Sequence, residues 1–399
     1  MVTTTDHELP VTSLTERYAV IDVDSHVTEP PDLWTSRIST AKWGDLVPHV
    51  VFDERLQMQR WMVGDSRLPA VGASSYAGWT QFPPTPPPTM DDMDPASFDP
   101  RERVKRLDEY GIARQIIYPN ILGFYSHLFA EMPDRGLARE IVAAYNDFQV
   151  WFSEEGDGRF VALTCIPYWD VDESLAEIER CAALGHRGVI LGLDYPKVGV
   201  PPLRDDYWTP VLSLTESLGL PVNFHIGFAA SNDKEERKHQ KMEDRRVYCK
   251  ETALFMLGNA TAIAEVIVSG LCERFPKLAF VSVESGAGFL PFLLRSLDWQ
   301  WMNSGTHDEY PDWLLPSEYF RRQIYGTFWF EAASVADALE QYPDNIMFET
   351  DFPHPTSLSP GPNSYSPNPR DLIDRELSSL PEETIEKVLH GTAARLYDL

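Results

Sequence analysis

The stretch Ala19-Val-Ile-Asp-Val-Asp-Ser-His-Val-Thr-Glu-Pro30 decides the fold of this chain. It begins with β-branched apolar residues and ends in turn-forming ones, so it predicts a short buried strand. Residues two apart on a strand face the same side, so Asp24 and His26 point in one direction at its end. A carboxylate and an imidazole placed in this way can bind a divalent cation, although a helix-capping Asp beside a packed His would give the same pattern.

Composition excludes several classes of partner. The chain has 399 residues, 43% of them hydrophobic, and a formal net charge of -27. Its length admits one to three domains, and its acidity argues against nucleic acid or an anionic membrane surface as a partner. The four cysteines lie far apart and show no metal-finger spacing. We find no signal peptide and no apolar run of about 18 residues, so we expect a cytoplasmic protein that acts on a small molecule.

Beyond residue 100, short apolar runs alternate with helical patterns. Eight predicted strands, counting the first, alternate with helices, and their continuous apolar faces suit a parallel sheet covered on both sides. This pattern favours an α/β fold, a (β/α)8 barrel, over an open doubly wound sheet, whose usual G-x-G-x-x-G does not follow the first strand. The later strands are expected at 115–119, 160–167, 188–192, 221–227, 278–286, 325–329 and 346–351. The helices are expected at 101–110, 134–155, 172–184, 206–218, 251–275, 289–302, 335–341 and 382–396.

The other segments are predicted to be additions to one barrel domain, residues 19–399, which follows a polar arm, residues 1–18. The largest is an insertion after the first strand, residues 31–100, with a predicted hairpin of 50–52 and 60–63. A proline-rich segment of this kind could be a disordered linker, but its tryptophans favour an ordered lid over a site. Residues 228–250 and 303–322 are predicted to be smaller insertions.

The candidate functional residues stand at the predicted strand ends. In a barrel, the carboxyl ends of the strands form the active-site face, so residues far apart in sequence meet there. Each residue alone has an ordinary structural explanation, but together they predict a divalent metal site. The set comprises Asp24, His26, His225, Glu284, Asp351 and His354.

With these motifs the chain resembles the amidohydrolase superfamily, specifically the branch related to aminocarboxymuconate semialdehyde decarboxylase. The resemblance covers residues 19–399 and implies a distorted (β/α)8 TIM barrel with one divalent metal ion, zinc or manganese. It implies four metal ligands: Asp24, His26, His225 and Asp351. The motifs that carry it are Asp22-Val-Asp-Ser-His-Val-Thr-Glu-Pro30, Phe224-His-Ile-Gly227, Glu284-Ser-Gly-Ala-Gly-Phe-Leu-Pro291, Glu349-Thr-Asp-Phe-Pro-His-Pro355 and Gly391-Thr-Ala-Ala-Arg-Leu-Tyr397.

Two positions depart from the family pattern. The first ligand pair is usually His-x-His, whereas here it is Asp24-x-His26, and some decarboxylases of the branch also carry a carboxylate there. Many members have a proton-transferring His at the tip of the sixth strand, where this chain has Glu284. A Glu can act as acid or base if burial raises its pKa, so the reaction is not inherited directly from the resemblance.

The resemblance implies a metal-dependent enzyme, and two reactions fit it. In a decarboxylase acting on a small aromatic or enolic carboxylic acid, Asp351 or Glu284 would protonate the carbon that loses carbon dioxide, with His225 completing the catalytic group. In a hydrolase, Asp351 would deprotonate the water that attacks an amide, a lactone or a β-diketone. The carboxylate at the first ligand position favours the decarboxylase slightly. A barrel that only binds a ligand is the third alternative.

Further residues are predicted to contact the substrate. His354 is expected at the mouth of the site, with a loop His that makes a structural hydrogen bond as the alternative. Glu29 follows the first strand, where it could instead support a ligand or belong to a turn. Trp61 and Trp79 of the insertion are candidates for a substrate lid, with core packing as the alternative. Arg295 could bind an anionic substrate or contact another subunit. The resemblance also implies a homodimer or higher homo-oligomer.

Overall fold

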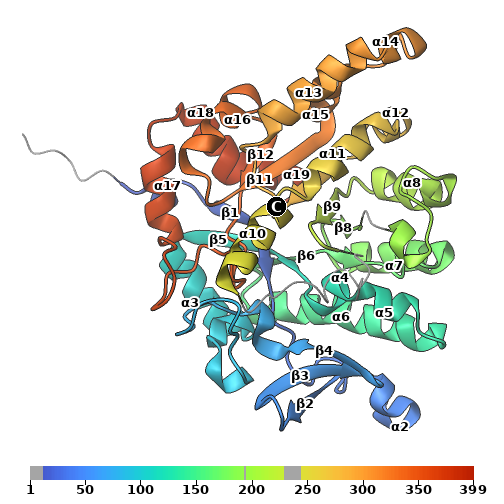
Figure 1. Cartoon of the computed structure of the whole chain (residues 1–399), viewed down its shortest axis with the longest axis vertical. Coiled ribbons are helices and arrows are strands. Elements are labelled where there is room, and N and C mark those ends of the chain that lie inside the picture. Colours follow the sequence, from blue (N-terminus) through green and yellow to red (C-terminus); the bar gives the residue numbers. More distant parts are fainter. Residues whose placement is uncertain (1–11, 193–194, 229–243) are drawn as a thin grey trace, which may run out of the picture.

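The first strand, β1 (Val20–His26), is buried at every residue. It pairs in parallel with β5 (Ile112–Tyr118), which pairs in parallel with β6 (Phe160–Ala162). The structure, a computed structural model, describes residues 12–192, 195–228 and 244–399 (Figure 1). Within these residues a second parallel sheet follows in chain order, with β7 (Thr164–Cys165), β8 (Val189–Ile190), β9 (Val222–His225), β10 (Phe280–Val283), β11 (Ile324–Phe328) and β12 (Ile346–Phe348).

Together the two sheets form the predicted distorted (β/α)8 barrel. Only Leu163 separates β6 from β7, which are two halves of the strand predicted at 160–167. At the other seam, Ser25 in β1 forms an isolated parallel bridge with Phe352, which follows β12. The backbone ladder is interrupted at both seams among the described residues, but the order of the strands follows the chain around the whole ring.

Helices surround the strands (Figure 1), and local sequence explains where they begin and end. In α3 (Pro100–Tyr110), Asp99 accepts hydrogen bonds from the first free backbone N–H groups, and Gly111, at a φ of 71°, ends the helix. An Asp caps α6 and α7 in the same way. The main helices that follow are α6 (Arg135–Glu155), α7 (Val171–Ala183), α8 (Thr209–Ser217), α11 (Asn259–Val268), α13 (Leu290–Asn303), α16 (Ala336–Gln341) and α17 (Pro369–Leu377).

The prediction of one long helix over 251–275 was wrong. The chain forms α10 (Arg245–Phe255), then α11, then α12 (Leu271–Arg274). A turn at residues 256–258 separates the first two, and Gly270 separates the last two with a φ of 80°, a conformation that glycine adopts without a steric penalty. The helix predicted at 382–396 is likewise interrupted, by a π-helical turn (Lys387–Gly391) between α18 (Glu382–Glu386) and α19 (Thr392–Tyr397).

One stretch of the described chain, Arg245–Val268, is long and apolar enough to cross a membrane by length and composition, which the sequence scan did not detect. It comprises α10 and α11. The inner face of α11, including Ile263 and Val266, belongs to the buried core of the barrel. Core helices of soluble proteins pass the same test, so this stretch is weak evidence for a membrane span.

The insertion after β1 is ordered and carries an antiparallel sheet of β2 (His49–Asp53), β3 (Met58–Val63) and β4 (Ser66–Ala70), drawn at the bottom of Figure 1. The predicted hairpin of β2 and β3 is confirmed. The sequence analysis missed β4 because Pro69 lies inside it, and proline is confined to strand edges and ends. The Trp34 ring contacts Trp61 edge to face at 5.2 Å, and its Nε1 donates to the carbonyl of Ile141 in α6, so the insertion is packed onto the barrel.

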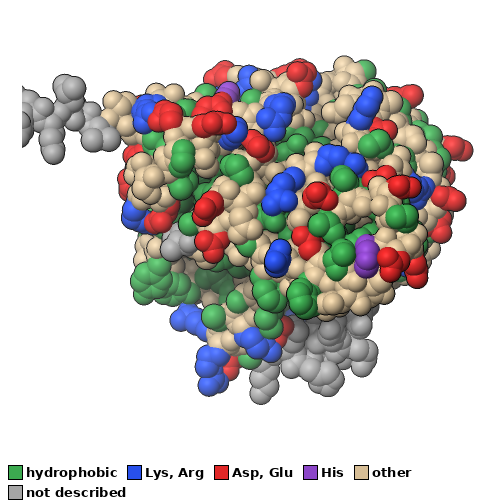
Figure 2. Space-filling model, turned by 90° about the horizontal axis from the view of Figure 1, so that it is seen from above, with side chains coloured by type: hydrophobic (Ala, Val, Ile, Leu, Met, Phe, Trp, Pro, Cys, Tyr) green, Lys and Arg blue, Asp and Glu red, His purple; other side chains and the backbone are tan. Residues whose placement is uncertain are grey.

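The chain before β1 is partly ordered. Residues 1–11 of the predicted arm lie outside the described residues, whereas Leu14–Arg17 form the short helix α1. The side chain of Leu14 is buried, and its backbone N–H donates to Asp374 of α17. Of the smaller predicted insertions, residues 229–243 lie outside the described chain, and residues 303–322 contain α14 (Thr306–Glu309) and most of α15 (Pro316–Gln323). On the face shown in Figure 2, acidic and basic side chains are interspersed.

Candidate metal centre and active-site cavity

Three predicted ligands converge at the carboxyl ends of β1 and β9. The Nε2 atoms of His26 and His225 lie 2.9 Å apart. Asp24 reaches both rings, with Oδ1 3.6 Å from His26 Nε2 and Oδ2 3.8 Å from His225 Nε2. All three side chains are fully buried, and neither oxygen of Asp24 has a hydrogen-bond partner among the described residues.

Two further carboxylates approach the same point from β10 and β12. Glu284 Oε2 lies 3.1 Å from His225 Nε2, and Asp351 Oδ1 lies 3.8 Å from His26 Nε2. Ligands bound about 2.1 Å from one cation are separated by roughly 3.0–3.4 Å, so the observed separations suit a single ion. Glu284 Oε2 also has no hydrogen-bond partner among the described residues, whereas Asp351 Oδ1 lies 2.8 Å from His354 Nδ1. The orphaned buried oxygens of Asp24 and Glu284 fit a divalent metal ion.

The backbone at both of these carboxylates is in the left-handed region. Glu284 has a φ of 58° and Asp351 a φ of 57°, where most residues with a side chain are disfavoured. Such conformations cost about 1–3 kcal/mol each and cluster at functional sites. Glu284 directly follows β10 and Asp351 lies three residues after β12, and both carboxylates approach the histidines.

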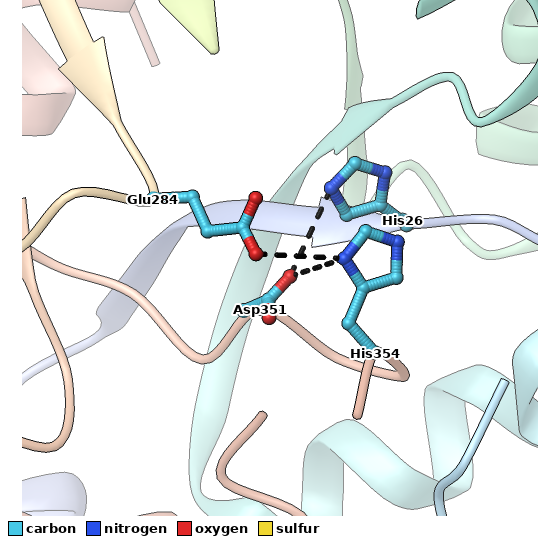
Figure 3. A group of neighbouring side chains, drawn as sticks. All are labelled: His26, Glu284, Asp351 and His354. Atoms are coloured by element: carbon cyan, nitrogen blue, oxygen red, sulfur yellow. Dashed lines mark ion pairs between the residues drawn. The ribbon is translucent and has the colours of Figure 1, made fainter. Parts of the chain in front are cut away.

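His354 joins this group, as Figure 3 shows with His26, Glu284 and Asp351. Its Nδ1 lies 2.8 Å from Asp351 Oδ1 and 3.8 Å from Glu284 Oε1. Its ring stacks on that of His26 with centroids 3.7 Å apart. Its Nε2 lies 2.9 Å from Oδ1 of Asn120. The structure therefore places His354 beside the other ligands, buried rather than at an open mouth, and its contact with the substrate stays a prediction.

The cluster is electrostatically unbalanced. Burial, together with Glu349, Asp351 and Glu284, raises the pKa of Asp24 well above its usual value. Burial lowers the pKa of His225 to about 4 and that of His26 well below its usual value, so both imidazoles are neutral and able to bind a metal. Burial and the neighbouring Asp351 likewise raise the pKa of Glu284. A bound cation would relieve this concentration of negative charge.

The sequence analysis missed one buried carboxylate, Glu349. It directly follows β12, its Oε1 has no hydrogen-bond partner in the described chain, and burial raises its pKa well above the usual value. The signal was present in the sequence, because Glu349 precedes Asp351 by two residues and therefore faces the same side. Its Oε2 accepts from the backbone N–H of Glu284 at 3.4 Å, so it supports the turn that holds that residue.

A polar network fixes the strand ends from behind. Arg103 of α3 is fully buried, and it donates to the backbone carbonyl of His26 at 2.6 Å and to Gln115 Oε1 at 3.0 Å. Gln115 donates to Asp22 Oδ2 at 2.7 Å, and Asp22 Oδ1 accepts from the backbone N–H of Thr350 at 2.8 Å. The network therefore ties α3 to the two strands that carry Asp24 and Asp351.

The metal centre adjoins a cavity of about 270 Å³. Glu284 and His354 form part of its wall, as do two of the predicted substrate-contacting residues, Glu29 and Trp61. The remaining wall combines aromatic side chains with small, aliphatic and polar residues, from segments that sequence patterns did not connect. It includes Phe124, Tyr125, Tyr248 and Phe255.

Two predicted substrate contacts lie elsewhere. Trp79 lines a neighbouring cavity of about 430 Å³, which meets the first at residues 354–356. The side chain of Arg295 is exposed on α13, outside the strand ring, and lines neither cavity, so its alternative role in a subunit contact stays a prediction. The helical sequence pattern around Arg295 does not show whether its side chain faces the strand ring or the solvent.

A TIM barrel with a buried His and carboxylate cluster at the ends of its strands defines a metal-dependent enzyme. The chain belongs to the amidohydrolase family, because the family model described as Amidohydrolase matches residues 21–399. The resemblance drawn from the motifs is thereby confirmed, together with the prediction of an enzyme that uses a divalent metal.

Solved structures show the same fold. An amidohydrolase from Mycobacterium avium subsp. paratuberculosis is 22% identical, covering 95% of this chain and 99% of that one, with a TM-score of 0.70. The 5-carboxyvanillate decarboxylase from Sphingomonas paucimobilis is 22% identical, with coverage of 95% and 99% and a TM-score of 0.62. A dihydroxybenzoic acid decarboxylase from Polaromonas, solved with manganese and 2-nitroresorcinol, is 18% identical, with coverage of 96% and 97% and a TM-score of 0.62.

Manganese is expected to stabilise the metal-stripped protein, because the ligand set exists only in the folded state. At a free Mn²⁺ concentration 1,000 times Kd, the free energy of unfolding should rise by about 4 kcal/mol. Asp351→Asn removes one ligand charge at constant size and should lose most of this increase. Urea unfolding with and without Mn²⁺ measures it. Asp308→Asn, which changes an exposed carboxylate on α14, should keep the full increase, and an equal increase in both variants would contradict the site.

Replacing Arg103 should destabilise the barrel. Arg103→Met leaves the carbonyl of His26 and the carboxylate of Asp22 without their buried cation, which should cost about 3–5 kcal/mol of unfolding free energy. Urea unfolding of the metal-free protein measures this loss apart from metal binding. Lys105→Met on the exposed face of the same helix is the control, with an expected change within about 0.5 kcal/mol. Equal unfolding free energies for Arg103→Met and the wild-type protein would contradict a stabilising role of this network.

Proposed function

We propose that this protein is a metal-dependent decarboxylase of a small aromatic or enolic carboxylic acid. The observation that carries the proposal is a buried ligand set beside a cavity whose wall includes Trp61, Phe124, Tyr125, Tyr248 and Phe255. The fold neighbours support it, since two of them are described as decarboxylases of 5-carboxyvanillate and of dihydroxybenzoic acid, the second with bound manganese. The size and lining of the cavity limit which acids this chain can bind.

The cavity suits a compact planar molecule. Its volume of about 270 Å³ lies below the range of roughly 300–1,000 Å³ that is typical of pockets for drug-sized ligands. Trp61 from β3 and Tyr248 and Phe255 from α10 offer ring faces or edges to a substrate ring. Glu29, Asn120 and Thr252 add polar groups that can orient hydroxyl substituents. We therefore infer a single-ring substrate.

The metal-binding residues are proposed to be Asp24, His26, His225, Glu284 and Asp351. A divalent cation bound there would supply a positive charge that holds the substrate carboxylate and polarises an adjacent oxygen. The chain itself keeps water away from the ligand atoms, because the ligand side chains are buried. Thr356 donates a hydrogen bond to Asp351 Oδ2, which fixes the orientation of that carboxylate.

Glu29 is proposed to supply the proton. Its Oε1 accepts hydrogen bonds from the backbone N–H groups of Asn120 and Ile121, each at 2.8 Å, so the carboxyl group is held on the cavity wall. Burial raises its pKa to about 7, which suits an acid working near neutral pH. The proton of Glu29 would add to the ring carbon that bears the carboxylate. The bond between these carbons then breaks, its electron pair returns to the ring, and carbon dioxide leaves.

The pH dependence of carbon dioxide release tests this role. The acid form of Glu29 is the active form, so the rate should be constant below about pH 7 and fall roughly tenfold per pH unit above it. Glu29→Gln keeps the acceptor for both N–H groups but has no proton of suitable pKa, so the rate should fall by about 10²–10⁴-fold and lose this pH dependence. Mn²⁺-loaded protein is assayed with hydroxybenzoic and enolic acids.

The proton-transfer roles predicted for Asp351 and Glu284 are the alternative for this step. If Glu284→Gln removed the pH dependence while Glu29→Gln kept it, the proton would come from Glu284. If no acid released carbon dioxide from metal-loaded protein, the decarboxylase proposal would fail, and binding of the acids without turnover would favour a ligand-binding barrel.

A hydrolase is the second candidate, and the adjoining cavity favours it. Carbon dioxide needs no cavity of its own, whereas the two fragments of a cleaved amide, lactone or β-diketone do. The cavity of about 430 Å³ beside residues 354–356 could hold one fragment while the aromatic cavity holds the other. Product mass separates the two reactions, because hydrolysis adds water and decarboxylation removes carbon dioxide.

A further inference from the structure

We propose that the larger cavity beside the metal centre, of about 430 Å³, is a separate binding site for a planar aromatic carboxylate. Arg375 would bind the carboxylate, and Phe82 and Tyr365 would contact the ring. The site does not rest on the proposed function, because this recognition uses no metal ion. An acid of this class is the substrate of the proposed decarboxylase, and hydrolysis of an aromatic amide or lactone would release one.

Segments that are distant in sequence form this cavity and are fastened to one another. They come from the insertion after β1, from the chain after β11 and after β12, and from α17. The backbone N–H groups of Tyr76 and Ala77 in the insertion donate to the carbonyl of Pro353, at 2.8 and 3.3 Å. The side chain of Asn363 donates to the carbonyl of Thr80. Because these bonds hold the walls together, the cavity is formed in advance and a ligand has little to order on binding.

The aromatic side chains of the cavity favour a planar ring as the ligand. The rings of Phe82 and Tyr365 are inclined by only 18°, with centroids 6.0 Å apart. Tyr365 is 96% exposed, so Phe82 covers little of its ring and leaves it free to contact a ligand. Aromatic rings attract one another in offset-stacked or edge-to-face arrangements, which an aliphatic chain cannot form. Five aromatic residues line the cavity: Tyr76, Trp79, Phe82, Phe330 and Tyr365.

The charge of the cavity favours an anion. The whole chain has 61 acidic and 34 basic side chains, yet no Asp or Glu of the described chain lines this cavity, whereas Arg375 does. A second cation, Arg245 of α10, lies over the Phe82 ring, with its Cζ 5.5 Å from the ring centroid. A ligand would therefore meet guanidinium groups beside an aromatic ring in a protein that is otherwise acidic. An aromatic anion matches both features.

The guanidinium of Arg375 has donors left for a ligand. Its Nε donates to Glu376 Oε1 at 2.6 Å, and neither Nη group donates to a described residue. A guanidinium presents five N–H donors in a planar fork, which matches the two oxygens of a carboxylate. The pair with Glu376 leaves the Nη groups available. Simple surface pairing of Arg375 with Glu376 is the alternative, and it predicts no effect of Arg375 on ligand binding.

The cavity shares a wall with the metal centre. Residues 354–356 line both cavities, and Thr356 of this wall donates to Asp351. The volume of the larger cavity lies within the range of roughly 300–1,000 Å³ that is typical of ligand pockets, so it has room for a single-ring acid. A bound acid would lie against this wall, on the side away from the aromatic cavity, without touching the metal ion. Its binding can therefore be measured apart from the metal.

The experiment is calorimetric titration of the full-length protein, both loaded with Mn²⁺ and metal-free, with three probes. Benzoate has a ring and a carboxylate, benzyl alcohol has the ring alone, and acetate has the carboxylate alone. We expect one benzoate to bind to each metal-free chain, and the same binding event to appear with unchanged affinity in the Mn²⁺-loaded protein. Benzyl alcohol and acetate should each bind at least about tenfold more weakly, because each lacks one of the two recognised groups.

Two variants locate the bound benzoate. Arg375→Met removes the guanidinium and should weaken binding by about 10–100-fold. Tyr365→Ala removes an exposed ring and should weaken binding by about 2–10-fold. Arg246→Met is the matched control, because it removes the same charge from a side chain of α10 that is 91% exposed and lies outside the cavity. It should bind benzoate as the wild-type protein does.

No binding of benzoate to the metal-free protein would overturn the proposal. Binding that needs Mn²⁺ would place benzoate at the metal centre and overturn it as well, as would binding that Arg375→Met and Tyr365→Ala leave unchanged. An equal loss in Arg246→Met would assign the effect to overall charge and not to the cavity. Failure of the decarboxylase proposal would appear separately, as an absence of carbon dioxide release from metal-loaded protein that still binds benzoate.

Discussion

The contact between the first and last strand regions is the constraint on which the rest of the structure depends. The backbone N–H of His26 donates to the carbonyl of Phe352 at 2.6 Å, and the backbone N–H of Asp351 donates to the carbonyl of Asp24 at 2.9 Å. These bonds close the ring of strands at its weaker seam. They also join ligand residues from opposite ends of the sequence, so the barrel cannot close correctly without assembling the metal centre. The network of Arg103 and Asp22 secures the same contact from behind.

The geometry of the metal centre lowers the stability of the metal-free folded protein. Glu284 and Asp351 adopt left-handed backbone conformations, and the carboxylates around them crowd like charges together in a buried space. The surrounding barrel, with its large apolar core, holds this arrangement in place before any ion arrives. Pre-formed ligands of this kind reduce the rearrangement needed on binding, and their mutual repulsion is what makes a cation so favourable there.

The parts of the molecule that could be predicted from sequence follow from short-range periodicity. Strand ends carry the chemistry of a barrel, so Asp24, His26, His225 and Asp351 could be brought together from their positions alone. Glu349 obeys the same two-residue rule and could have been found. The predictions that failed concern features that depend on tertiary contacts. The break in the helix expected at 251–275 requires a turn at Gly258 that hydrophobic pattern does not encode, and β4 tolerates Pro69. Aromatic side chains of the cavity wall come from both β3 and α10, and no local sequence pattern connects these two elements.

The ligands span the chain from Asp24 to Asp351. A ribosome that has made most of the protein has therefore produced the earlier ligands without Asp351, and the emerging chain has no complete centre to offer. Contacts between such distant residues also form slowly, because a long loop must close before they are gained. Metal loading is consequently an event of the finished and folded chain. Metal supply during synthesis cannot direct folding here, as it does in small domains that fold around their ion.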